Sequence, residues 1–130
     1  SARRFISGLK AGVNIEGLRL IVLDKDTLPE TIKPVIKEIA AGLNAGVISE
    51  AGCPGVADPG ALAVGLAHQA GVEVIPLVGP SSILMALMAS GMNGQSFAFH
   101  GYLPIEKHDR VKAIHKLETE SRVKNQTQLF

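Results

Sequence analysis

The sequence predicts an α/β fold, with a mainly parallel sheet covered by helices on both faces and the start of a second α/β domain behind it. Three observations predict it. Short apolar runs alternate with helical patterns over residues 18–91. Two of these runs lead into loops rich in glycine and proline, each followed by an apolar helix. Beyond residue 105, charged residues replace the apolar pattern. Such alternation is typical of parallel strands buried between helices.

The first half of the predicted sheet follows from apolar spacing. Side chains that recur every three or four residues indicate helices, whereas short continuous apolar runs indicate buried strands. The expected elements are a helix end at 2–9 with Phe5, Ile6 and Leu9 on one face, a strand at 18–23, an amphipathic helix at 31–43 and a short strand at 45–49. Pro34 fits that helix only if it lies in the first turn.

The middle of the chain is predicted from helix start and stop signals. Asp58 suits an N-cap, Pro59 suits the first helical position, and Gly71 suits the C-terminal end of the same helix. Residues 72–77 form the next expected strand. A second helix is expected over 80–90, stopped by Gly91.

After a polar turn at 92–95 the character of the chain changes. The expected elements are an extended segment at 96–102, a charged helix at 106–124 with Val111, Ile114 and Leu117 on one stripe, and a strand beginning at 127. We place a domain boundary here. Residues 1–97 are predicted to be an incomplete N-terminal domain, and residues 98–130 a linker and the beginning of a truncated C-terminal domain. The whole chain is expected to be an internal piece of a longer protein.

Composition narrows the class of protein. The chain has 130 residues, 46% of them hydrophobic and 19% charged, which is typical of a globular domain. The net charge of +1 gives no general case for a nucleic-acid binder. The single cysteine, Cys53, excludes an internal disulfide and fits a reducing compartment. No apolar run reaches the ~18 residues of a membrane span.

The first loop, residues 49–60, resembles a phosphate-binding loop only in part. Gly55 and Gly60 have the glycine spacing of that motif, but Ala61 and Leu62 stand where lysine and serine or threonine are needed. Asp58 would also repel a phosphate. A neutral or cationic ligand with a polar tail therefore fits the loop better than a polyphosphate, and a pair of tight turns without any ligand stays open.

Four motifs carry a resemblance to a known family. They are Ser49-Glu-Ala-Gly-Cys-Pro-Gly-Val-Ala-Asp-Pro-Gly60, Pro76-Leu-Val-Gly-Pro-Ser-Ser82, Ala89-Ser-Gly91 and Phe99-His-Gly-Tyr-Leu-Pro104. In this order and spacing they resemble the tetrapyrrole methylase superfamily, and most closely its ribosomal RNA small subunit methyltransferase I branch. The resemblance covers nearly the whole chain.

The resemblance implies a two-domain α/β methyltransferase, expected to be a cytoplasmic homodimer, that binds S-adenosyl-L-methionine between its domains. It implies no metal. The acceptor implied is a ribosomal RNA cytidine, methylated on its 2'-hydroxyl. The positions that match cofactor contacts of the family are Ala51, Gly52, Cys53, Val56, Gly79, Pro80, Ser81 and Ser82. Glu50 and Cys53 stand where that branch usually has Asp and Thr. A tetrapyrrole or other small acceptor, or a non-catalytic ligand-binding module on this fold, therefore stays open.

Other polar and aromatic side chains have simpler interpretations. Cys53 is expected to line the pocket rather than act as a nucleophile, and the catalytic residues stay unassigned, with His100 and Glu50 as possible bases. His108 and His115 would need a further ligand to hold a metal, so a solvated helix face is expected. Phe97, Phe99 and Tyr102 are expected in the core rather than in a base-stacking platform.

Overall fold

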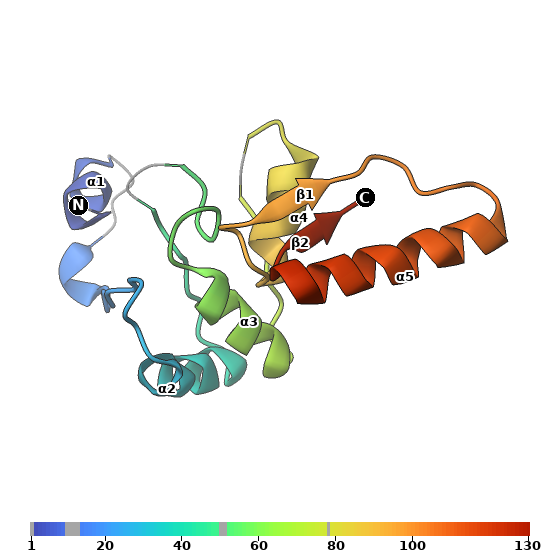
Figure 1. Ribbon diagram of the computed structural model, residues 1–130. Helices are drawn as coiled ribbons and strands as arrows, with labels where there is room; N and C mark the ends of the chain where they lie inside the picture. The colour runs from blue at the N-terminus through green and yellow to red at the C-terminus, as the bar shows by residue number, and fades with distance from the viewer. Residues whose placement is uncertain (1, 10–13, 50–51, 78) are drawn as a thin grey trace.

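The computed structural model describes residues 2–9, 14–49, 52–77 and 79–130 (Figure 1). The elements along these residues are α1 (Ala2–Gly8), the 3-10 helix η1 (Ile15–Gly17), α2 (Pro29–Ala40), α3 (Ala61–Gln69), α4 (Ser82–Ser90), β1 (Phe97–Phe99), α5 (Lys107–Lys124) and β2 (Thr127–Leu129). Helices α1 and η1 lie at one end of the molecule, and α5 extends along the other (Figure 1). The α/β class is confirmed.

The main core lies between α2 and α3. Ile32, Ile36 and Ala67 are buried there, and partly buried apolar residues surround them: Leu23, Ile39, Leu62, Ala63, Leu66, Val72 and Val74. The helical spacing predicted for α2 places Ile32 and Ile36 one turn apart, so both side chains face α3. The Arg19 guanidinium bridges both carboxylate oxygens of Glu38 at 2.8 and 2.7 Å, which ties the coil before α2 to its outer side.

Helix α4 packs against α3 through two glycines. A Cβ atom added to Gly91 would lie 2.6 Å from the backbone nitrogen of Gly65, so the two backbones touch where side chains would separate them. Gly91 also has φ +68 and ends α4, as the sequence predicts. Nearby, Nε2 of His68 lies 2.6 Å from the Ala89 carbonyl oxygen and adds a polar link between the helices.

The second half of the chain builds a small sheet. Strands β1 and β2 are parallel, with Phe97, Ala98 and Phe99 paired to Thr127, Gln128 and Leu129. Helix α5 makes the crossover between them, and its buried Leu117 faces this unit. Thr127 is also buried, with its hydroxyl donating to the Asn93 carbonyl at 2.8 Å. The predicted boundary between residues 97 and 98 stays a prediction.

The larger parallel sheet predicted for residues 18–23, 45–49 and 72–77 is not formed in the described part of the chain, whose only ladder joins β1 to β2. The three segments run as coil (Figure 1). A cavity of about 740 Å³ is lined by residues 43–49 and 72–77 among others, and no ladder joins these two segments in the described part of the chain. Without the ladder, apolar side chains such as Val22 and Leu77 stay exposed.

Two predicted helix starts are wrong. Helix α2 begins at Pro29, which is well suited to a first helical position, and this leaves Pro34 inside the helix rather than in its first turn. Helix α3 begins at Ala61 with Gly60 as its N-cap, so Asp58 and Pro59 precede the helix. Gly60 has φ +146, which glycine alone adopts readily, and this turn sets the start of α3.

The aromatic residues predicted to lie in the core are exposed instead. Phe97 and Phe99 are 37% and 57% exposed, and Tyr102 is fully exposed. Their side of β1 has no covering element among the described residues, since β2 pairs only along the edge of the strand. On α5, the predicted stripe is buried only at Leu117, while Val111 and Ile114 are exposed.

Candidate functional site

The first loop is a series of tight turns over residues 52–60. The Val56 amide donates to the Cys53 carbonyl at 3.0 Å, and Gly52, Gly55, Ala57 and Gly60 all have positive φ. A Cβ atom on Gly60 would lie 2.9 Å from the Gly55 nitrogen, so the loop folds closely on itself. Gly52 has φ +77, and among the described residues nothing lies within 4 Å of the position its Cβ atom would take, which leaves room for a ligand to approach the backbone.

A neighbouring turn holds this loop in place. The Ala57 amide donates to the Gly94 carbonyl at 3.0 Å. A Cβ atom on Gly94 would overlap the Gly55 carbonyl oxygen, so only glycine fits there. On the other side of the same turn, Asn93 donates from its side chain to the Asn125 carbonyl at 2.6 Å. The turn at 93–94 therefore connects the first loop to the α5–β2 unit.

The second loop leads into α4. Ser81 is the N-cap of α4, and its hydroxyl oxygen accepts from the Leu84 amide at 3.4 Å. Gly79, Pro80 and Ser82 are exposed, and Ser81 is half-buried. The first amides of a helix lack intrahelical partners, so this loop offers donors and hydroxyls to a polar ligand.

The cavity of about 740 Å³ adjoins the first loop and the segment before the second. Its lining includes Ser49 and Pro54 from the first loop and Leu77 from the segment before the second. The remaining lining is mainly apolar and comes from α2, α3, Met88 of α4 and the coil segments. The predicted site residues Gly52, Cys53, Val56, Gly79, Pro80, Ser81 and Ser82 do not line it. Ala51 and the possible base Glu50 lie outside the described residues. The assignment of these positions to a ligand therefore stays a prediction.

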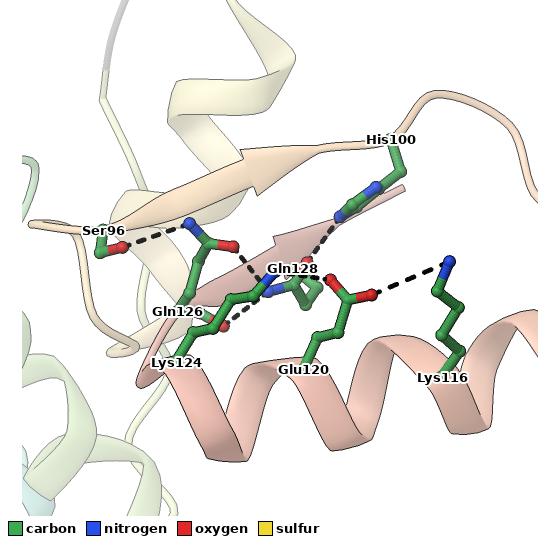
Figure 2. Close-up of polar contacts among 7 residues, drawn as sticks. All are labelled: Ser96, His100, Lys116, Glu120, Lys124, Gln126 and Gln128. Carbon is green, nitrogen blue, oxygen red and sulfur yellow. Dashed lines mark hydrogen bonds and ion pairs between the residues drawn. The ribbon is translucent and has the colours of Figure 1, made fainter.

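A chain of side-chain amides holds His100 at the end of β1 (Figure 2). Gln126 donates from its side chain to the Ser96 hydroxyl at 3.3 Å, and Gln128 donates to the Gln126 carbonyl at 3.0 Å. The nitrogen of the Gln128 amide is thereby engaged, and its oxygen lies 2.5 Å from His100 Nε2. Because that oxygen only accepts, Nε2 carries the proton, and in the neutral ring Nδ1 is the free basic nitrogen.

Glu120 lies on α5 beside this histidine (Figure 2). Lys124 contacts it at 3.1 Å and Lys116 at 3.9 Å. The hydrogen bond from Lys124 lowers the pKa of the Glu120 carboxyl, and the charges of Lys124, Lys116 and His100 act in the same direction. Glu120 is thus a charged neighbour of His100. Of the two possible bases, His100 is the one that lies within the described residues.

The other predicted side chains are placed as follows. Cys53 is half-buried in the first turn of its loop. Within residues 2–9, 14–49, 52–77 and 79–130, no group of three or more His, Cys, Asp or Glu side chains is placed to hold a metal ion. His108 and His115 are exposed on α5, and His115 lies 3.9 Å from Glu118. In the same ranges no helix is long and apolar enough to cross a membrane.

Sequence reasoning missed Asn93, Gly94 and Gln128. The Asn-Gly pair was predicted only as a polar turn, and nothing in its local pattern indicates the contact with Gly55. Gln128 lies 28 residues from His100 along the chain, so their contact depends on the parallel pairing of β1 with β2.

Known proteins that are similar in sequence to this α/β chain are methyltransferases. No protein-family model matches the chain. Three of the matched curated proteins carry the same name, ribosomal RNA small subunit methyltransferase I. That of Xylella fastidiosa is 36% identical over 111 residues, 85% of this chain and 40% of the relative. Those of Buchnera aphidicola and Vibrio cholerae are 34% and 38% identical over 79% and 68% of this chain, and 36% and 31% of the relatives.

This chain is a sequence relative of ribosomal RNA small subunit methyltransferase I, and the predicted resemblance to that branch is confirmed. The chain spans about a third of the length of the curated relatives it matches. The names of those relatives describe the longer proteins as a whole.

Proposed function

We propose that this chain is the cofactor-binding part of a methyltransferase that uses S-adenosyl-L-methionine and methylates a 2'-hydroxyl of small-subunit ribosomal RNA. The observation that carries the proposal is the similarity to proteins named ribosomal RNA small subunit methyltransferase I over most of this chain. We also propose a cytoplasmic homodimer on the tetrapyrrole methylase domain plan. Since the chain spans about a third of those relatives, the 130 residues alone are proposed to be inactive.

The first loop would hold the cofactor through its backbone. The proposed contacts are Ala51, Gly52, Cys53 and Val56. Gly52 supports this role because, in the part of the chain that the structure describes, nothing lies within 4 Å of the position its Cβ atom would take. Cys53 is half-buried and is followed by Pro54, so this short loop offers backbone groups rather than long side chains. The apolar body of a nucleoside and a polar tail both suit such a surface.

The second loop would hold the polar end of the ligand. Gly79 and Pro80 set the turn, and Ser81 and Ser82 present hydroxyls where α4 begins. Adenine nitrogens or a carboxylate accept hydrogen bonds from such groups. When bound, the cofactor supplies the methyl group, and the protein supplies orientation and exclusion of water. As the carbon–oxygen bond forms, the bond between the methyl carbon and sulfur would break, leaving S-adenosylhomocysteine. The acceptor hydroxyl loses its proton in this step, and Nδ1 of His100 is a candidate acceptor for that proton.

Transfer of a tritiated methyl group tests the proposal. The intact protein that carries this sequence is incubated with methyl-labelled cofactor and small-subunit ribosomal RNA. A 2'-O-methyl group blocks alkaline cleavage of the adjacent linkage, so the label is expected in alkali-resistant dinucleotides. Label released in mononucleotides, or none in the RNA, would contradict the assigned acceptor. Label transferred to a tetrapyrrole instead would favour the other acceptor of the same superfamily.

A further inference from the structure

Helix α5 carries more positive than negative side chains. The helix has six lysines and arginines against three carboxylates, whereas the whole chain has a net charge of only +1. The excess positive charge is therefore concentrated on one element, and the rest of the chain is net acidic. We define the basic face of α5 as His108, Lys112, His115 and Lys116, which recur at helical spacing on one side.

The basic face is open to solvent. By helical spacing His108, Lys112 and His115 lie opposite Leu117, and Lys116 lies at the border nearer the strands, beside Glu120 (Figure 2). Leu117 marks the inner side of the helix and is 8% exposed, whereas the four residues of the basic face are all exposed. The side chains of His115 and Lys116 are 74% and 77% exposed. In Figure 1, β1 and β2 lie along one side of α5 only, and the opposite side is uncovered in this structure.

The positive charge of this face is only weakly neutralised. Toward the end of the helix, Arg122 and Lys124 form close ion pairs with Glu118 and Glu120 at 2.6 and 3.1 Å. Lys116 lies 3.9 Å from Glu120, which Lys124 already engages. Lys112 has no ion pair among residues 107–124, all of which the structure describes. The carboxylates of Asp109 and Glu118 stand at the borders of the face rather than within it.

We infer that the basic face of α5 binds the phosphate backbone of the RNA acceptor. Exposed lysines spaced one turn apart are charge-complementary to a row of phosphates, and they displace counterions when the RNA binds. A protein neighbour that covered this surface would bury Lys112, which has no ion pair among residues 107–124, and burial of an unpaired charge is costly. The inference rests on the proposed function and adds to it the surface by which RNA is held.

A double variant, Lys112→Gln with Lys116→Gln, tests the inference in the intact protein. The probe is small-subunit ribosomal RNA made by transcription, and binding is measured by fluorescence anisotropy over a series of salt concentrations. The variant is expected to bind roughly tenfold more weakly, and the slope of log affinity against log salt is expected to fall by about 0.7–0.9 for each lysine. A side chain with a merely structural role would not change that slope.

The matched control removes two exposed lysines from another helix, Lys33→Gln with Lys37→Gln on α2. It changes the net charge equally and is expected to leave the affinity and the salt slope within twofold of the parent. Equal loss in both double variants, or unchanged RNA binding in the α5 variant, would overturn the inference.

Calorimetric titration of S-adenosylhomocysteine separates this inference from the proposed function. If the α5 variant binds this ligand normally and its RNA affinity has an unchanged dependence on salt, only the inference about the RNA-binding face is contradicted. Absence of binding in the parent protein contradicts the methyltransferase itself.

Discussion

Glycines near the first loop serve two different purposes. Gly52 has open space around it, whereas Gly60 and Gly94 lie so close to Gly55 that a side chain at either position would collide with backbone. The sequence shows that the loop is rich in glycine but does not distinguish these purposes. Close backbone packing depends on residues far apart in the chain, such as Gly55 and Gly94, so it becomes visible only in three dimensions.

Replacing Gly94 by alanine is expected to destabilise the protein. The new Cβ atom would overlap the Gly55 carbonyl oxygen, so the loop or the turn must shift and the hydrogen bond from Ala57 to Gly94 is strained. A loss of about 1–3 kcal/mol in the free energy of unfolding is expected, as for other overpacked sites. Denaturation with urea, followed by circular dichroism, measures it.

Gly46→Ala is the control for this prediction. Gly46 has nothing within 4 Å of its would-be Cβ atom, and its backbone is not in the positive-φ region. Its replacement is expected to change the free energy of unfolding by less than about 0.5 kcal/mol. If Gly94→Ala were as mild as Gly46→Ala, the contact between the first loop and the turn at 93–94 would be wrong.

At the scale of elements, helices were predicted better than strands. The predicted helices over 31–43, 80–90 and 106–124 appear at Pro29–Ala40, Ser82–Ser90 and Lys107–Lys124. Helical hydrogen bonds are local, so caps and apolar spacing largely determine them. A strand exists only with a partner, and residues 18–23, 45–49 and 72–77 have apolar runs but no ladder in the described structure.

The charge pairs of α5 give this helix a dependence on pH. The hydrogen bond from Lys124 lowers the pKa of Glu120 below that of an ordinary glutamate. A lowered pKa in the folded state means that the stabilisation is present above the unfolded pKa of about 4.3 and is lost as the pH falls through the folded pKa. At pH 7 the parent is therefore expected to have a higher melting temperature than Glu120→Gln. This difference in melting temperature should vanish in acid.

Carbon-13 NMR of the Glu120 carboxyl measures the shift directly. Its midpoint is expected below the ordinary glutamate value in the parent and is expected to rise in Lys124→Gln, which removes the hydrogen bond. The Glu120 side chain is 29% exposed and in contact with solvent, so added salt should also reduce the shift. A midpoint that Lys124→Gln leaves unchanged would contradict this assignment of its cause.

At the scale of the whole molecule, one turn joins the parts that carry the proposed chemistry. Asn93 and Gly94 contact the first loop on one side and Asn125 and Thr127 on the other. The proposed cofactor loop and the α5–β2 unit with the proposed RNA surface are thus joined through this turn. The four motifs in the sequence were sufficient to identify the relatives, because motif order does not depend on how the strands pair. The arrangement of the motifs in space depends on that pairing and was not predictable from them.

The most direct test of the central claim is calorimetric titration of S-adenosylhomocysteine into the intact protein, with Gly52→Trp compared against Gly71→Trp. The two glycines are matched, since φ is +77 and +70 and no atom of the described residues lies within 4 Å of either would-be Cβ beyond the chain neighbours. Backbone strain is therefore similar in both variants. The account predicts that the ligand binds the parent and Gly71→Trp alike and that Gly52→Trp abolishes binding. Equal affinity in all three proteins would contradict the cofactor site at the first loop.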